Sequence, residues 1–173
     1  MAIKIGSYNA RGLRQPSKRR QQFAYLHRHH FDIVFIQETH STSSDDRFWC
    51  NEWGGNILFS HGTSSSRGVA IFFRPGTSFD ILKIHCDNSG RFVVADVGYG
   101  GSIFTLLSVY GPNLDSPNFY SNVSTCLSNF QCDNMICGGD FNFVFNLDLD
   151  KEGGARRTNF NARKDCFTLM EKI

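Results

Sequence analysis

The chain has 173 residues, of which 40% are apolar and 14% aromatic, and its formal net charge is only +2. This length and composition predict one globular domain with a sizeable core, residues 1–173, and exclude a disordered chain. A membrane-spanning helix is excluded because the chain has no run of about 18 apolar residues.

The first predicted elements are a strand, a helix and a second strand. Residues 2–8 alternate between apolar and polar in the manner of a strand, and Asn9 follows that strand. Pro16 opens a helix that runs to about His29. The nearly continuous apolar run DIVFIQE, residues 32–38, is typical of a strand that is covered on both faces.

A short helix is expected next, within residues 42–53, with Ser43 or Ser44 as its cap. Several strand-like runs then follow one another, and Gly, Asn, Asp and Ser separate them in the manner of meander turns. These runs cover residues 56–61, 68–74, 79–86, 91–98 and 103–110.

The last part of the chain is predicted to hold two helices and one strand. Ser116 caps a helix that extends to residue 130, with Pro117 at its first position. Residues 134–139 form a buried strand, and residues 158–173 form the final helix. The alternation that starts at residue 140 fits a half-buried strand as well as the edge of a site. Together these elements predict an α/β or α+β sandwich.

Polar side chains stand at the ends of several predicted strands. Side chains at strand ends converge on one rim when the strands share a sheet, and ligand sites lie at such rims. The converging set contains two carboxylates, amides and a phenol, contributed by Asn9, Gln37, Glu38, Tyr110, Asn113, Asp140 and Asn142.

This set suits a hard divalent cation, because Mg²⁺ takes oxygen ligands from one or two carboxylates, substrate phosphate and water. Glu38 is the natural metal ligand, and Asp140 could activate a water molecule. Asn9 and Asn142 could orient phosphate or carboxylate oxygens, and Tyr110 could donate to a phosphate oxygen. The set therefore indicates metal-assisted hydrolysis of a phosphodiester.

Each of these residues also has an ordinary structural interpretation. A carboxylate after a strand is commonly a turn residue or a helix cap, and Tyr110 fits a half-buried core aromatic. His40, beside Glu38, fits a histidine of a surface loop rather than a general base. Residues 148–159 resemble a calcium-binding loop, but Asn159 stands where its bidentate Glu is required.

Charge and cysteine content indicate the kind of ligand and the cellular compartment of the protein. The chain has two basic groups: seven Lys and Arg residues within residues 1–31, and a second set within residues 151–164. Such groups suit a polyanion such as nucleic acid, although solvated helix faces are the alternative. The six cysteines form no C-x-x-C pair and are expected to be reduced, mostly buried thiols. The first residues lack the apolar segment of a signal peptide, so we predict a nuclear or cytoplasmic protein that is not secreted.

Five motifs resemble the endonuclease/exonuclease/phosphatase superfamily in their order along the chain: SYNARGL, DIVFIQETH, GVAIFF, LLSVYGPN and CGGDFN. The residues of these motifs are most similar to those of the endonuclease domain of LINE-type (non-LTR) retrotransposons. The resemblance implies a four-layer α/β sandwich of the deoxyribonuclease I type, with the site on the rim of two sheets. It also implies DNA as substrate, Mg²⁺ or Mn²⁺ as cofactor, and a reverse transcriptase domain downstream in a full-length protein.

The resemblance implies roles for the matching residues. Glu38 binds the metal ion, Asn9 positions that ligand or the phosphate, and Tyr110 contacts the scissile phosphate. Asp140 activates the attacking water or assists the leaving group, and Asn142 orients that water or the phosphate. Further contacts with phosphate or DNA are expected from Arg11, Asn113 and Lys151.

The resemblance also predicts that residues after Asn142 form a loop, with Phe143 and Phe145 in the core and Asp150 as a structural anchor. The family ends with a late Asp and a Ser-Asp-His motif, and neither is found before Ile173. We therefore expect a fragment of a larger reading frame or a decayed gene copy, in which the second sheet lacks its last strands.

Three hypotheses follow for the function. The first is a Mg²⁺-dependent endonuclease domain that nicks DNA, similar to apurinic/apyrimidinic endonucleases. The second is a catalytically inactive fragment that keeps the fold and binds nucleic acid weakly. The third is a phosphatase of the same superfamily that acts on a small phosphoester.

Overall fold

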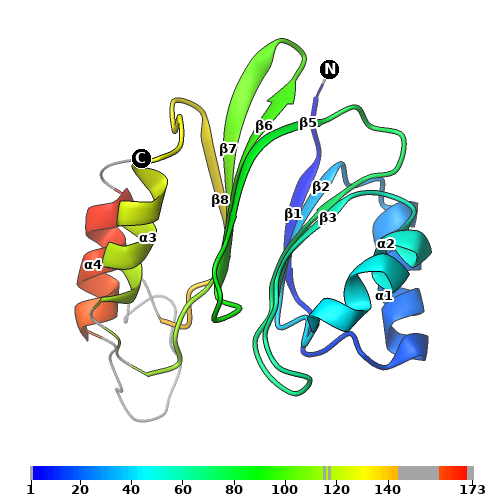
Figure 1. Ribbon diagram of the computed structural model, residues 1–173, viewed down its shortest axis with the longest axis horizontal. Helices are drawn as coiled ribbons and strands as arrows, with labels where there is room; N and C mark the ends of the chain where they lie inside the picture. The colour runs from blue at the N-terminus through cyan, green and yellow to red at the C-terminus, as the bar shows by residue number, and fades with distance from the viewer. Residues whose placement is uncertain (1, 115, 117, 144–159, 171–173) are drawn as a thin grey trace.

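The computed structural model describes residues 2–114, 116, 118–143 and 160–170. Within these residues two four-stranded sheets pack face to face, and helices cover the outer face of each sheet (Figure 1). The layers are therefore helices, sheet, sheet, helices, which confirms the predicted four-layer α/β sandwich. No helix in this part of the chain is both long and apolar enough to cross a membrane.

The first sheet comes from the N-terminal half of the chain. Its strands, in spatial order, are β1 (Ile5–Asn9), β2 (Ile33–Gln37), β4 (Val69–Phe73) and β3 (Ile57–Ser60). β1 and β2 are parallel, whereas β4 runs antiparallel to both of its neighbours. The outer face is covered by α1 (Pro16–Arg28) and α2 (Asp46–Trp53), the second preceded by a 3₁₀ turn, η1 (Ser43–Asp45).

The second sheet is a meander with one parallel strand added. Its strands, in spatial order, are β5 (Asp80–Cys86), β6 (Phe92–Tyr99), β7 (Ser102–Tyr110) and β8 (Met135–Asp140). The first three are antiparallel, as their short turn segments predict, and β8 is parallel to β7. The helices on its outer face are α3 (Phe119–Leu127) and α4 (Phe160–Met170).

Alternate residues of the central strands pack into different hydrophobic cores, one on each face of the sheet. In β2, Val34 and Ile36 pack against the helices of the first sheet, whereas Ile33 and Phe35 pack against the second sheet. Because both faces are covered, all five residues of β2 are buried, which confirms the interpretation of its continuous apolar run. All six cysteines are free thiols as predicted, but the expectation that most are buried is wrong, because only Cys166 is buried.

Three sequence predictions are wrong in detail. The cap near residue 43 is Thr42, because Asp45 reaches back to its N–H in a capping box. α3 begins at Phe119 rather than at residue 117, because the Phe119 N–H closes a turn on the Ser116 carbonyl (3.1 Å), and it ends at Leu127 rather than at residue 130. β8 is half-buried rather than buried, because within the described residues it has a strand neighbour on one side only.

Candidate active site

The carboxyl ends of two parallel strand pairs bring the predicted residues together. In the first sheet, Asn9 at the end of β1 pairs with the last residue of β2, and Glu38 follows it directly. In the second sheet, Tyr110 at the end of β7 pairs with Asp140 at the end of β8. Because the two sheets pack face to face, all four side chains reach one rim, where ligand sites of α/β sheets are found.

The Asn9 amide joins the two carboxylates. Its Nδ2 donates to Glu38 Oε1 at 3.1 Å and to Asp140 Oδ2 at 2.8 Å, so a single amide group bridges the two sheets. The Tyr110 hydroxyl donates to the same Glu38 oxygen at 2.9 Å. Glu38 Oε2 accepts none of these bonds and lies 3.9 Å from His40 Nε2.

The loop after β8 is held at Gly111. The Gly111 N–H donates to the Asp140 carbonyl at 2.7 Å, and Asn142 Nδ2 donates to the Gly111 carbonyl at 2.7 Å. The Asn142 N–H in turn donates to Asp140 Oδ1 at 3.1 Å, from a left-handed backbone with φ of 54°. A side chain at Gly111 would lie 2.2 Å from the Phe141 carbonyl, so only glycine allows this close approach.

The segment that carries Glu38 is fixed by main-chain bonds in an unusual conformation. Glu38 and His40 both have positive φ, 51° and 57°, which is costly for residues other than glycine. The loops after β1 and before β4 hold this conformation, because Gly12 N donates to the Glu38 carbonyl (2.7 Å) and His40 N to the Arg67 carbonyl (2.9 Å). The direction of the Glu38 carboxylate is therefore set before any ligand binds.

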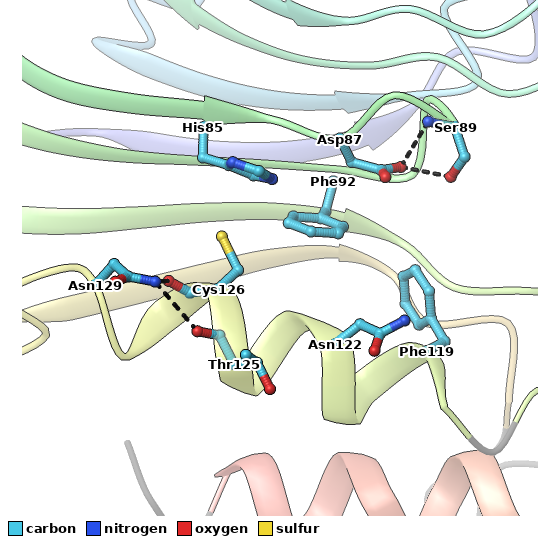
Figure 2. Close-up of a pocket in the computed structure, with 9 residues that line it drawn as sticks. All are labelled: His85, Asp87, Ser89, Phe92, Phe119, Asn122, Thr125, Cys126 and Asn129. Atoms are coloured by element: carbon cyan, nitrogen blue, oxygen red, sulfur yellow. Dashed lines mark hydrogen bonds between the residues drawn. The ribbon is translucent and has the colours of Figure 1, made fainter.

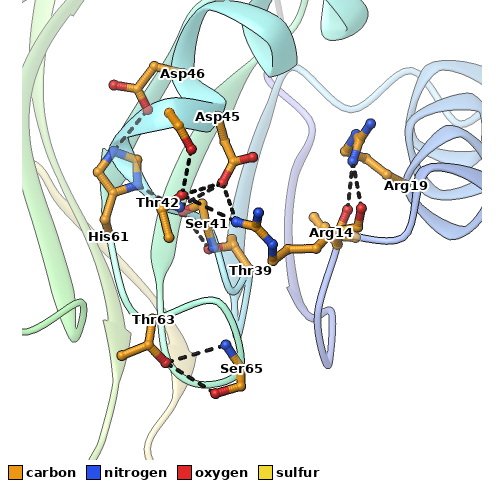
Figure 3. Close-up of polar contacts among 12 residues, drawn as sticks. Arg14, Arg19, Thr39, Ser41, Thr42, Asp45, Asp46, His61, Thr63 and Ser65 are labelled. Carbon is orange, nitrogen blue, oxygen red and sulfur yellow. Dashed lines mark hydrogen bonds and ion pairs between the residues drawn. The ribbon is translucent and has the colours of Figure 1, made fainter.

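A chain of side chains continues from this segment to α2 (Figure 3). Thr39 Oγ1 lies 2.9 Å from Ser41 Oγ, which lies 3.0 Å from His61 Nδ1, and His61 Nε2 lies 2.8 Å from an Asp46 carboxylate oxygen. The order Ser–His–Asp is that of a hydrolase triad. Ser41 is 0% exposed, however, so its hydroxyl cannot meet a substrate and the chain serves to hold the loop.

Burial changes two ionisable groups of the site. It raises the pKa of Tyr110, and the hydrogen bond to Glu38 adds to this increase, so the phenol stays protonated and able to donate. Burial lowers the pKa of His40 and outweighs the opposing effect of the Glu38 charge. His40 is therefore biased toward its neutral form.

Part of the site lines a cleft of about 300 Å³. Glu38, Tyr110 and the predicted contact residue Asn113 line it. His40, interpreted from the sequence as a residue of a surface loop, also lines the cleft. Sequence reasoning missed the remaining lining residues, for which the adjacent glycines in SSSRG and SGR were the only available signal. These residues are Ser65, Ser66, Arg67 and Arg91.

Two residues that were predicted to contribute side chains to the site, Gln37 and Arg11, do not join the hydrogen bonds around Glu38 and Asp140 through their side chains. Gln37 is 1% exposed and lies between the sheets, with Nε2 3.4 Å from Ser7 Oγ, so it does not reach the rim. Arg11 is joined to the site through its main-chain N–H, which donates to Asn9 Oδ1 at 3.0 Å. Several predictions lie outside the described residues: those for Phe145, Asp150, Lys151 and the calcium-loop candidate. Phe143 packs against the core of the second sheet, as predicted.

A second cleft, of about 400 Å³, lies between the second sheet and α3 (Figure 2). Much of its polar lining is already bonded within the protein. Asp87 Oδ2 accepts from the N–H groups of Ser89 (3.1 Å) and Arg91 (2.9 Å), and Asn129 Nδ2 donates to helix carbonyls of α3. We therefore assign the functional site to the rim that holds Glu38 and Asp140.

The donor set at the rim fits a hard cation. Its charged groups are two carboxylates, and the described residues contain no cluster of three or more His, Cys, Asp or Glu that would enclose a metal ion. Such a set leaves most coordination positions to water and substrate oxygens, which is how Mg²⁺ is commonly bound. Glu38 Oε2 is the oxygen best placed to take part, because the Asn9 and Tyr110 bonds occupy Oε1.

Comparison with known proteins identifies relatives. Over 147 residues, or 83% of its length, the chain is 30% identical to the transposon TX1 uncharacterized 149 kDa protein of Xenopus laevis, and it spans 11% of that protein. A solved AP endonuclease from Archaeoglobus fulgidus matches 99% of the chain and 71% of its own length with a TM-score of 0.73 and 20% identity. The endonuclease domain of TRAS1, a telomere-specific non-LTR retrotransposon, matches 98% of the chain and 71% of its own length with a TM-score of 0.67 and 14% identity.

Because the sequence identity of the two solved structures to this chain is low, they show a shared fold and nothing further. Family membership rests on a different finding. The model of the endonuclease/exonuclease/phosphatase family matches residues 6–163, which is nearly the whole chain and includes every residue of the rim cluster. The chain therefore belongs to the endonuclease/exonuclease/phosphatase family of hydrolytic enzymes.

Proposed function

We propose that the chain is the endonuclease domain of a retrotransposon-type protein and cuts phosphodiester bonds of DNA with Mg²⁺, for which Mn²⁺ can substitute. The observation that carries this proposal is the bridge of the Asn9 amide between Glu38 and Asp140 at the rim of two sheets. The transposon protein of Xenopus laevis and the TRAS1 domain support the retrotransposon context. In the full-length protein we expect a reverse transcriptase domain downstream.

The proposed roles follow from the hydrogen bonds. Asp140 accepts a proton from the attacking water, and the N–H groups of Asn9 and Asn142 hold its carboxylate in a fixed orientation. Tyr110 is a protonated donor beside Glu38 and can turn its hydroxyl toward a phosphate oxygen. Glu38 would hold the cation, which supplies Lewis-acid polarisation of the phosphate when it is bound.

Plasmid nicking tests this proposal. Purified protein incubated with supercoiled DNA is expected to give open circles in Mg²⁺ and none in EDTA. The variant Asp140→Asn should lose the reaction, whereas Asp133→Asn, which removes the same charge from an exposed turn before β8, should keep it.

A parallel phosphoinositide assay separates the rival hypotheses. Phosphate release without nicking would contradict the proposal in favour of a small-phosphoester phosphatase. Folded protein that binds DNA but supports neither reaction would contradict it in favour of a non-catalytic fragment.

A further inference from the structure

Two arginines of the cleft are half-buried without a carboxylate partner, whereas Arg28 and Arg47, which also form no ion pair with a described residue, are exposed. Arg14, Arg19 and Arg74 each form an ion pair, with Asp45, Glu52 and Asp32 respectively. Arg67 and Arg91 are half-buried and line the same cleft. Within the described part of the chain, neither forms an ion pair with an acidic residue.

The spacing of the two arginines is fixed by the main chain. Gly68 N donates to the Gly90 carbonyl at 3.0 Å, which joins the loop of Arg67 to the loop of Arg91. Both glycines have positive φ, and a side chain on Gly90 would lie 2.4 Å from the His61 carbonyl. The close contact between the loops therefore depends on glycine, and it holds two cations near each other.

One edge of the Arg91 guanidinium is already in use. Arg91 Nη1 donates to the Gly111 carbonyl at 2.9 Å, and the guanidinium lies over the Tyr110 ring at 5.3 Å. No hydrogen bond from Nε or Nη2 to a described residue is present, and the same holds for the side chain of Arg67. An arginine fork with a free edge is suited to a phosphate, which it can bind through two parallel N–H groups.

The electrostatics favour an anion at this place. Burial lowers the pKa of Arg91, and the nearby charge of Arg67 lowers it further, so the Arg91 cation is disfavoured by its surroundings. Uncompensated charge is costly to hold away from water. A bound anion would remove this cost, and the cleft can admit one because it is open to solvent beside Ser65 and Ser66, both exposed.

We propose that Arg67 and Arg91 form a subsite for a phosphodiester group that neighbours the bond being cut. This inference rests on the proposed function, because Glu38 and Tyr110 line the same cleft as the two arginines. The subsite makes the enzyme select a polynucleotide, whose strand carries a phosphate at each step, over a small ester that carries only the reacting group.

Neutral linkages provide the first test. A duplex oligonucleotide with one mapped nick site is prepared with a single uncharged methylphosphonate at each linkage within two positions of that site. For the unchanged protein, one of these substitutions should lower kcat/KM by roughly 10- to 100-fold, the scale of a lost charged hydrogen bond. Arg67→Gln, which keeps Arg91, should discriminate clearly less between the charged and that neutral substrate, whereas Arg20→Gln, which loses an exposed arginine paired with Glu52, should discriminate as the unchanged protein does.

Binding without cleavage provides the second test. In EDTA, the affinity for the same duplex is measured by fluorescence anisotropy over a range of KCl concentrations. Loss of one phosphate contact should reduce the slope of log K against log salt by about 0.9 in Arg67→Gln and leave it unchanged in Arg20→Gln. Arg67 is the primary variant because its side chain holds no main-chain group in place, and a thermal melt confirms that the variant is folded.

The two tests separate the subsite from the proposed reaction. A reduced slope in a protein that never nicks DNA would support the subsite and contradict the nuclease. Normal nicking, with no sensitive linkage and an unchanged slope, would overturn the subsite and leave the nuclease standing.

Discussion

Glu38 and Asp140 face each other across the Asn9 amide, but different kinds of interaction hold the two carboxylates in position. Glu38 belongs to a segment whose neighbours Gln37, Thr39 and Ser41 are each at most 1% exposed. Asp140 ends a half-buried strand, and the bonds made by Gly111 and Asn142 determine the position of its carboxylate. One half of the site is thus positioned by burial and the other by a few local hydrogen bonds.

This difference separates stability from chemistry within one site. Changes on the Glu38 side disturb buried polar groups and close loop contacts, whose loss costs folding free energy. Changes on the Asp140 side reach fewer buried neighbours and are expected to appear mainly in the reaction rate. The following predictions test that separation, from the largest expected effect to the smallest.

Asp140→Asn should show the largest effect on activity with little effect on folding. The nicking rate should fall by at least about 100-fold, the scale of lost general acid–base help, which corresponds to about 2.7 kcal/mol of activation free energy. The change is nearly isosteric and disturbs at most one hydrogen bond, worth about 1 kcal/mol of unfolding free energy. A large loss of thermal stability would contradict the distinction between the two sides.

The residues at strand ends could be predicted because strand ends are visible in a sequence. Asn9, Glu38 and Asp140 each stand where an apolar run stops, and parallel strands place such positions on one rim. Arg91 gave no such signal, because it precedes β6 and reaches the site only through the register of β6 and β7.

Burial of an edge strand could not be predicted in the same way. The run MICGG is as apolar as a central strand, but burial depends on what lies beside a strand in space. For β8 the described residues place a strand on one side only. The positive φ of Glu38 likewise had no sequence signal, since main-chain bonds from distant segments enforce it.

Gly68→Ala should show the converse behaviour, with stability lost on the Glu38 side. Gly68 has φ of 89°, and an added methyl group would lie 2.3 Å from Thr39 Oγ1. Backbone strain and overpacking together should lower the unfolding free energy by about 2–4 kcal/mol. Urea denaturation measures this loss.

The matched control for that change is Gly76→Ala. Gly76 also has positive φ, 77°, but nothing lies within 4 Å of an added methyl group. Its cost should be limited to the backbone strain, about 1–2 kcal/mol. Equal losses in the two variants would show that crowding at Thr39 contributes nothing to the support of Glu38.

Glu38→Gln should give a smaller effect that is specific to the metal ion. The remaining amide oxygen can still accept from Asn9 and Tyr110, so the geometry is kept while the charge is lost. A neutral amide is a poorer ligand for a hard cation, and we expect the Mg²⁺ concentration for half-maximal nicking to rise by about 10-fold, or 1.4 kcal/mol. An unchanged Mg²⁺ titration would place the ligand elsewhere.

His40 should show the smallest effect, and only in acid. Burial lowers the pKa of His40 in the folded protein, so below its ordinary value of about 6.5 the unfolded chain binds a proton that the folded protein does not. The stability that neutral His40 contributes is therefore complete above about pH 6.5 and is lost as the pH falls through its folded pKa. His40→Gln, which has no such proton to gain, should lose less unfolding free energy between pH 7 and 5 than the unchanged protein. Parallel curves for the two proteins over this range would mean that the Glu38 charge, and not burial, governs His40.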